Sequence, residues 1–414
     1  MATAPDRPSA ERPSPDRPAP DRPAPGGPSP DRPAPGGPSP DGPSPSGQDE
    51  SPAPAPARRP EEEAVEDSAG APDRGPGHAP ADAPRGVRAV YGVLTGARDV
   101  LAAGARRLGW TPALLSYPGY AGPDGARVLG RVLLAPRGVE PSRRRGLPGW
   151  RRFLTLELPD QAVEVRLGGT AVTAVSDGSG LLDAVVDVAL EPGPTEVRLA
   201  VPGRPALHGV VHTAPAEPVR GVVCDVDDTV WITGLSRPLV AFWRTVARSS
   251  AQRHPVPGVA ELLRALVRDE PHAPVVYLSN GAWNLNGPVV RFLRRHRFPA
   301  GPVLMTDWGV TPERWFRDGR QHKRETLERL VRELPHVRWV LVGYDGEHDP
   351  DIYRDLARRH PGAVEAVAIR QVGPGSRPVV DAEGDVPVVS APDGRALQEV
   401  LRPHLGRPRR VPAD

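Results

Sequence analysis

The 414-residue sequence lacks several features that would indicate particular classes of protein. Its single cysteine, Cys224, excludes an internal disulfide and a cysteine-rich zinc site. No apolar run approaches 18 residues and the N-terminus has no apolar signal region, so we expect neither a membrane-spanning helix nor a signal peptide. The formal net charge of +2 provides no overall field toward nucleic acid, and no pattern of nucleic-acid readers is present. We therefore expect a cytoplasmic protein that binds no nucleic acid.

Lysine is almost absent as well. Of the 53 Lys and Arg residues, only Lys323 is a lysine. Lysine carries a compact, rotatable point charge that the planar guanidinium of arginine cannot imitate in a tight site. Lys323 is therefore a candidate functional residue, with chance survival as the alternative.

Residues 1–85 contain almost no large apolar side chain. They are dominated by Pro, Gly, Ser, Asp, Arg and Ala, and the unit DRPAPGGPSP occurs at 21–30 and again at 31–40. Such a segment cannot bury enough surface to offset its ordering entropy. The composition predicts a disordered tail of polyproline character, acting as a spacer or as a docking segment for an unknown protein partner.

Residues 86–215 are predicted to form a helix followed by a β-rich domain. Apolar residues at helical spacing over 86–110 predict an amphipathic helix that packs on the next domain or lies on a membrane. The apolar period then changes to two, and Gly, Pro and Asp turns separate the runs, which indicates a small antiparallel sandwich or barrel. The predicted strands are 127–134, 152–158, 162–167, 184–190 and 196–201. The Arg-rich loop at 141–152 is either solvated or a contact for anionic lipid.

Residues 216–405 alternate between short apolar runs and helical patterns. This alternation predicts an α/β domain with a doubly wound parallel sheet. The predicted strands are 219–224, 274–279, 302–306, 337–342 and 364–369. The predicted helices are 237–250, 257–269, 287–296, 321–334, 350–359 and 393–404. An apolar stripe on the first of these helices is either core or a surface for a lipid's acyl part.

Polar side chains follow three of these strands directly. Asp225, Asp227 and Thr229 follow the first strand, Ser279 ends the second, and the acidic loop 343–349 follows the fourth. Lys323 precedes the fourth strand. Ligands of parallel sheets bind at the carboxyl ends of the strands, and buried carboxylates are costly there unless they hold a metal or share protons. The pattern therefore predicts an active site.

The residue types favour phosphoryl transfer through an aspartyl-phosphate. Of two acids two residues apart, one can act as nucleophile and metal ligand and the other as general acid and base. Ser279 can hydrogen-bond a phosphoryl oxygen, and Lys323 can neutralise charge on nucleophile and phosphate. A hard divalent cation, most simply Mg²⁺, completes such a site.

These motifs resemble the haloacid dehalogenase superfamily. Within it, residues 219–370 look like the catalytic domain of the actin-patch-associated phosphatidate phosphatases and their bacterial relatives, which are related to the lipin catalytic domain. A preceding β-rich domain is similar to that family too, so the resemblance covers roughly 86–370. The segments that carry it are DVDDTVWITG, HPVPG, VVYLSNGAWNL, LMTDWG, QHK and GYDGEHDPDIY.

The resemblance implies a role for each matching residue. Asp225 would attack phosphorus and bind Mg²⁺, and Asp227 would protonate the leaving alkoxide, activate water and offer its backbone carbonyl to the metal. Thr229 would shape the loop, Ser279 would hold the phosphate, and Lys323 would stabilise the pentavalent species. The implied substrate is phosphatidate, with peripheral membrane contact.

One position departs from the family pattern, which has an aspartate as direct Mg²⁺ ligand where this chain has Tyr344. We expect Asp345 and Asp349 to complete the metal ligands alongside Asp225 and Asp227, with Glu347 as another source of a carboxylate. Two alternatives stay open. The domain is a non-catalytic phospholipid-binding module with an impaired metal site, or it is a phosphatase for a soluble phosphomonoester.

Overall fold

A computed structural model of the chain describes residues 100–136, 156–232, 253–306, 312–373 and 375–406, without the side chains of 312–318. The chain divides into two compact units, 1–69 and 70–414, and every described residue lies in the second. The predicted tail (1–85), the Arg-rich loop (141–152) and the predicted helix over 237–250 lie outside the described residues. The predicted domain boundaries remain predictions.

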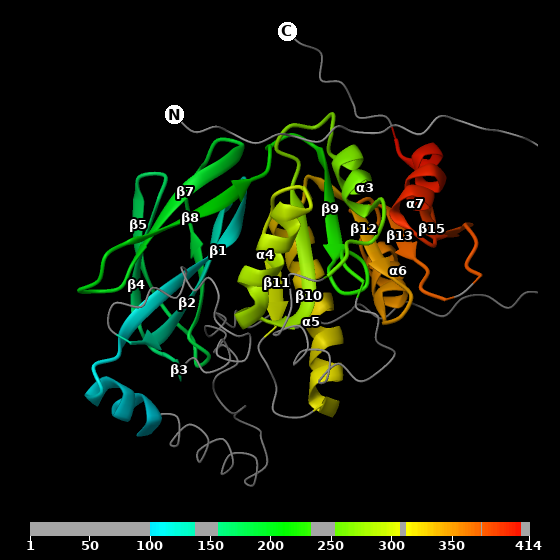
Figure 1. The fold of residues 1–414 in the computed structure, drawn as a ribbon. Coiled ribbons are helices and arrows are strands. Elements are labelled where there is room, and N and C mark those ends of the chain that lie inside the picture. Colours follow the sequence, from blue (N-terminus) through cyan, green and yellow to red (C-terminus); the bar gives the residue numbers. More distant parts are fainter. Residues whose placement is uncertain (1–99, 137–155, 233–252, 307–311, 374, 407–414) are drawn as a thin grey trace, which may run out of the picture. The chain divides into compact units, whose positions relative to one another are not determined.

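The first part of the described chain forms one eight-stranded sheet (Figure 1). Its strand order is β3-β2-β1-β8-β7-β4-β5, with β6 paired to β2. Neighbours are antiparallel except β1 and β8, which run parallel. The strands are β1 (Thr111–Gly122), β2 (Gly125–Ala135), β3 (Leu156–Glu157), β4 (Ala162–Leu167), β5 (Thr170–Val175), β6 (Leu181–Val186), β7 (Gly193–Ala200) and β8 (Leu207–Thr213).

The period of two is visible in the burial of these strands. Along β4, Val163, Val165 and Leu167 are buried while the residues between them are not. The strands β2, β3, β4, β6 and β7 overlap predicted ones. The strands β1, β5 and β8 were missing from the prediction, and the sandwich or barrel stays a prediction.

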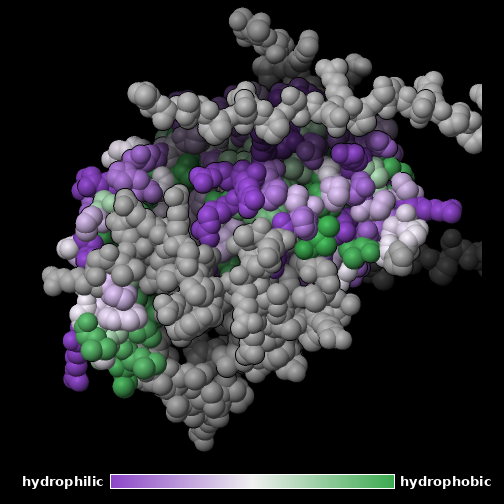
Figure 2. All heavy atoms as spheres, viewed as in Figure 1, coloured by the Kyte–Doolittle hydropathy of each residue, from purple (hydrophilic) through white to green (hydrophobic). Residues whose placement is uncertain are grey.

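A helix over residues 100–107 precedes β1 and falls within the predicted amphipathic segment. Its Ala102 and Ala105 are buried in the core of the first sheet, so one face packs on that sheet. Val100, Leu101 and Leu108 are exposed. Figure 2 shows hydrophobic residues gathered over this helix, at the lower left of the view. The segment therefore packs on the following domain, as predicted, with apolar side chains left on its outer face.

The second part of the described chain is an α/β domain around a seven-stranded sheet of order β11-β10-β9-β12-β13-β15-β14. All neighbours are parallel except the β14–β15 pair. Its strands are β9 (Val219–Asp225), β10 (Val275–Ala282), β11 (Val303–Thr306), β12 (Val337–Tyr344), β13 (Val364–Arg370), β14 (Val379–Glu383) and β15 (Val386–Ala391). Its helices are α3 (Val259–Leu266), η3 (Trp283–Leu285), α4 (Asn286–Arg295), α5 (Pro312–Glu333), α6 (Asp349–Arg359), α7 (Gly394–Leu401) and η4 (Arg402–His404).

The structure confirms the strands predicted in this half and adds a hairpin, β14–β15, that the prediction missed. All residues of β9 are buried, because parallel strands covered on both faces consist of continuous apolar runs. Gly221 is required in β9, since a Cβ there would lie 2.7 Å from the Trp339 ring on β12. No helix in the described parts of the chain combines the length and apolar character that crossing a bilayer requires.

Specific contacts join the first sheet to helices of the α/β domain. The Tyr120 hydroxyl donates to the Glu333 carboxylate at 2.6 Å, and the Arg127 guanidinium also pairs with Glu333. Tyr117 of β1 stacks on Trp283, with ring centroids 4.9 Å apart. Tyr117 and Tyr120 belong to the same buried cluster as the core of the second sheet. The first sheet is therefore packed against the α/β domain through buried aromatic and charged groups.

Candidate active site

The loop after β9 turns sharply and buries two carboxylates. The amide of Val226 donates to the Leu278 carbonyl at 3.0 Å and so continues the strand, and Asp228 then adopts φ 52°, which reverses the chain. The Thr229 side chain consequently points toward the end of β9, and its hydroxyl donates to Asp225 Oδ2 at 3.0 Å. Thr229 lies where a loop-shaping residue is predicted.

Lys323 gathers three acids around one ammonium group. Its Nζ lies 2.7 Å from Asp225 Oδ1, 2.6 Å from Asp349 Oδ1 and 3.6 Å from Glu347 Oε2. The side chains of Lys323 and Asp225 are 1% exposed and that of Asp349 is 0% exposed. A lysine so enclosed has no room for a guanidinium, which accounts for a lysine at this position in an arginine-rich chain.

The charges in this cluster shift one another's pKa values. Burial lowers the pKa of Lys323, but the carboxylates of Asp225, Asp349 and Glu347 outweigh that effect, so its pKa lies well above the ordinary value. Burial raises the pKa of Asp225, and the Lys323 ammonium opposes this shift. Lys323 is therefore a fixed cation at neutral pH, directly beside the predicted nucleophile.

Asp227 is held separately from Asp225. Its Oδ1 accepts a hydrogen bond from Trp231 Nε1 at 3.2 Å, and its Oδ2 accepts one from the Ser279 hydroxyl at 3.0 Å. Burial raises the pKa of Asp227 to about 6, with the Glu347 carboxylate adding to the rise and the two hydrogen bonds opposing it. A carboxyl with a pKa near neutrality suits proton transfer in both directions.

In the acidic loop after β12, some carboxylates point toward Lys323 and others point away from it. Asp349 begins α6 and reaches Lys323, while Glu347 accepts a hydrogen bond from the Asn280 amide at 3.0 Å. Asp345 is exposed, and its carboxylate accepts from the Val372 amide at 2.9 Å. Tyr344 is buried, and burial raises the pKa of its hydroxyl, with Glu347 adding to the rise. The structure thus brings Asp349 and Glu347 to the cluster and places Asp345 apart from it.

Comparison with known proteins finds a family that resembles this part of the chain. Residues 220–371 match the model of the catalytic domain of phosphatidate phosphatase APP1. This part of the chain is APP1-like. The phosphatidate phosphatase APP1 of Saccharomyces cerevisiae is 26% identical over 238 residues, which are 53% of this chain and 39% of that protein. An uncharacterised protein of Schizosaccharomyces pombe is 24% identical over 152 residues, 36% of this chain and 25% of that protein.

The chain therefore spans less than half the length of these two curated relatives. Among solved structures, a chain of the Pnkp1/Rnl/Hen1 complex overlaps 38% of this chain and 46% of its own length, at 21% identity and a TM-score of 0.27. A structure of PhoD overlaps 70% of this chain and 67% of its own length, at 9% identity and a TM-score of 0.28. Likenesses this weak support no argument about fold or function.

The APP1-like domain has oxygen donors of the kind that a metal ion needs, but their side chains are not grouped around one point. Carboxylate oxygens are the ligands that Mg²⁺ prefers, so the donor type of Asp225, Asp349 and Glu347 fits. Within the described ranges, however, no three His, Cys, Asp or Glu side chains form a group that could hold a metal ion. The acids instead surround Lys323. Tyr344, where the resemblance in sequence implies an aspartate, contributes only a neutral phenol.

Three residues around the APP1-like site were missed from sequence. The Trp231 indole donates a hydrogen bond to Asp227, and the Arg253 guanidinium lies over its ring, 4.2 Å from the ring centroid. Asn280 holds Glu347, and Arg370 donates to the Asp228 backbone carbonyl. Trp231 and Asn280 lie within motifs that carry the resemblance, so proximity to the acids was a usable signal for both. Arg370 gives no such signal, because only the parallel pairing of β13 brings it near.

Proposed function

We propose that the APP1-like domain hydrolyses a phosphomonoester, phosphatidate, through an aspartyl-phosphate on Asp225. The observation that carries the proposal is the Lys323 ammonium, which joins Asp225 to Asp349 at the carboxyl edge of the sheet beside Asp227. The segment's likeness to phosphatidate phosphatase APP1 supports the choice of substrate. We also infer a doubly wound haloacid-dehalogenase-type fold for the α/β domain. Because phosphatidate resides in a bilayer, the proposal includes a cytoplasmic protein in peripheral contact with a membrane.

In the first half-reaction a carboxylate oxygen of Asp225 attacks phosphorus, and the bond from phosphorus to the lipid alkoxide breaks. Asp227 donates its proton to the departing alkoxide, which suits a carboxyl whose pKa burial raises to about 6. In the second half-reaction Asp227 takes a proton from water, whose oxygen attacks phosphorus and releases inorganic phosphate and Asp225. Lys323 offsets negative charge at Asp225 throughout.

Mg²⁺ belongs to this proposal as an expected cofactor. Asp225, Asp349 and Glu347, with the backbone carbonyl of Asp227, would hold it. When bound, the cation supplies charge stabilisation to the transferring phosphoryl group. Asp345 would join these ligands only if its loop turned inward from Val372.

The proposal is tested by offering the full chain two substrates with and without Mg²⁺. Phosphate release is measured from phosphatidate in mixed micelles and from the water-soluble p-nitrophenyl phosphate. We expect Mg²⁺-dependent release from phosphatidate, which chelation by EDTA stops. Turnover of the soluble substrate alone would assign the protein to soluble phosphomonoesters, and no turnover of either would contradict an enzyme.

The Tyr344→Asp variant tests the departure from the family pattern. An aspartate there restores a carboxylate beside Asp225 and Lys323, where the neutral phenol is a poor ligand for Mg²⁺. We expect the Mg²⁺ concentration needed for half-maximal activity to fall by about tenfold or more, as for other changes in metal-site carboxylates. Tyr344→Phe is the matched control, since it removes only the hydroxyl and adds no charge. Equal Mg²⁺ dependence of Tyr344→Asp and the natural protein would show that the other acids already suffice.

A second candidate function is specifically favoured by Tyr344. With a phenol in place of the metal-binding aspartate, the domain would bind phosphatidate without hydrolysing it. Sedimentation with phosphatidate-containing liposomes, compared with phosphatidylcholine liposomes, measures this binding directly. Specific binding without phosphate release would favour the binding module over the enzyme.

A further inference from the structure

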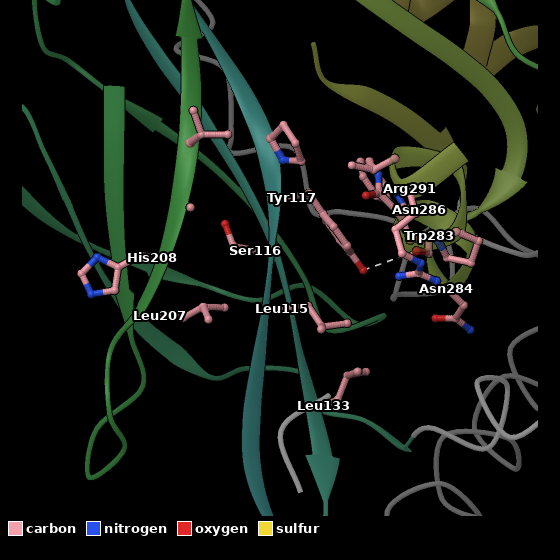
Figure 3. A pocket seen from close by; sticks show the side chains of 16 residues that line it. Leu115, Ser116, Tyr117, Leu133, Leu207, His208, Trp283, Asn284, Asn286 and Arg291 are labelled. Carbon is pink, nitrogen blue, oxygen red and sulfur yellow. Dashed lines mark hydrogen bonds between the residues drawn. The ribbon is translucent and has the colours of Figure 1, made fainter. Parts of the chain in front are cut away.

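A cavity of about 490 Å³ lies between the first sheet and the α/β domain. One wall comes from β1, β2 and β8, and the other comes from η3 and the start of α4 (Figure 3). Cavities of this size, at the junction of two structural parts, are where small molecules commonly bind. The mechanism proposed above makes no use of it.

The walls are predominantly apolar. Leu115, Leu133 and Leu207 line the cavity from the strands, and Pro288 and Val290 line it from α4. Arg291 of α4, which is exposed, adds a cationic group to the lining. The ligand that fits such a lining is a hydrocarbon chain with a negatively charged or polar end, because hydrocarbon needs no hydrogen-bond partners.

One residue of the cavity wall is close in sequence to the active site. Trp283, which lines it, directly follows β10, and Ser279 of the active site lies four residues earlier in that strand. Four residues of extended strand span about 13 Å. The Trp283 wall of the cavity therefore lies within the length of an acyl chain from Ser279.

Contacts across the cavity hold its walls in place. Figure 3 shows Tyr117 reaching from β1 toward Trp283, and its hydroxyl lies 3.5 Å from the Trp283 carbonyl. Arg131 of β2 donates to the Asn284 side chain at 3.0 Å. Because both contacts join the first sheet to η3, the cavity is formed before a ligand arrives.

We propose that this cavity binds an acyl chain of the lipid phosphate, an inference that rests on the proposed function. It makes the first sheet part of the substrate site and selects long-chain lipid phosphates over short soluble phosphomonoesters. A peptide is the poorer occupant, since its backbone amides and carbonyls would be left without partners against the leucine and valine walls.

Two variants fill or charge the cavity from opposite walls. Val290→Trp fills it from α4, and Leu207→Glu places a carboxylate in it from β8. For both we expect the KM for long-chain phosphatidate in mixed micelles to rise about tenfold, the equivalent of about two lost methylene burials. Turnover of p-nitrophenyl phosphate should stay within about twofold. Val185→Trp is the matched control, because Val185 is 63% exposed on β6 outside the cavity.

A binding measurement separates this inference from the proposed function. Trp283 fluorescence is measured with vesicles of phosphatidate that carry brominated acyl chains, which quench tryptophan on contact. We expect quenching in the natural protein that is reduced in Trp283→Phe and in Leu207→Glu. If no phosphatase activity is found, the proposed function fails while the quenching still tests the cavity. Quenching equal in all three proteins, or hydrolysis of long-chain phosphatidate unchanged in both cavity variants, would overturn the inference.

Discussion

The Asp225→Asn variant should lose phosphate release from phosphatidate by a factor on the order of 10⁵ or more, as when another hydrolase loses its covalent nucleophile. An amide oxygen is too weak a nucleophile to form the phosphoryl bond. The fold should persist, because asparagine keeps an acceptor for the Thr229 hydroxyl, and Asp349 remains 2.6 Å from the Lys323 ammonium. Initial rates of phosphate release, measured beside a thermal melt, check both expectations.

The matched control for this loss is Asp269→Asn. Asp269 is an exposed carboxylate of the same α/β domain, after α3, so the change alters the net charge equally without touching the cluster. We expect its rate and melting temperature to equal those of the natural protein. If Asp225→Asn instead retains the natural rate while Asp269→Asn does too, then Asp225 is not the nucleophile, and the acids around Lys323 serve binding alone.

The convergence of Asp225, Asp227, Ser279 and Lys323 could be predicted from sequence for a physical reason. The carboxyl ends of neighbouring parallel strands meet at one edge of a sheet, and β9 and β10 are direct neighbours with Leu278 opposite Asp225. The apolar runs that predict those strands are short, continuous and bounded by polar residues. Their residue types and order were therefore sufficient to place the side chains near one another.

The acidic loop was harder to predict because its acids share one short segment. The amino-acid sequence of residues 343–349 does not indicate which side chains point toward the site. The structure decides it by starting α6 at Asp349, which is fully buried, and by leaving Asp345 in an exposed turn. The first sheet shows the same limit: β1 contains Pro118 and three glycines or prolines around it, which are turn signals in sequence, yet pairing with β2 and β8 makes it a strand.

The Lys323→Met variant should lower the free energy of unfolding at pH 7 by about 3–5 kcal/mol, the usual cost of leaving buried charges without their partner. Methionine fills similar space but leaves the Asp225 and Asp349 carboxylates, which are 1% and 0% exposed, without a cation. The pKa of Lys323 is raised in the folded protein, so its stabilisation is fully present below its ordinary pKa of 10.5 and is lost only as pH rises through the folded value. The loss is thus measurable by urea denaturation at neutral pH.

The pH dependence of that loss distinguishes charge from packing. Without Lys323, burial and the neighbouring carboxylates raise the pKa of Asp225 further, so protonation as pH falls below 7 removes the unpaired charge. The deficit of Lys323→Met relative to the natural protein should therefore shrink over that range. The neighbouring Arg324→Met is the control, since Arg324 is exposed on the same helix and its loss should cost no more than about 0.5 kcal/mol. A deficit that stays constant with pH would mean that Lys323 stabilises the domain by packing and not by pairing with buried charge.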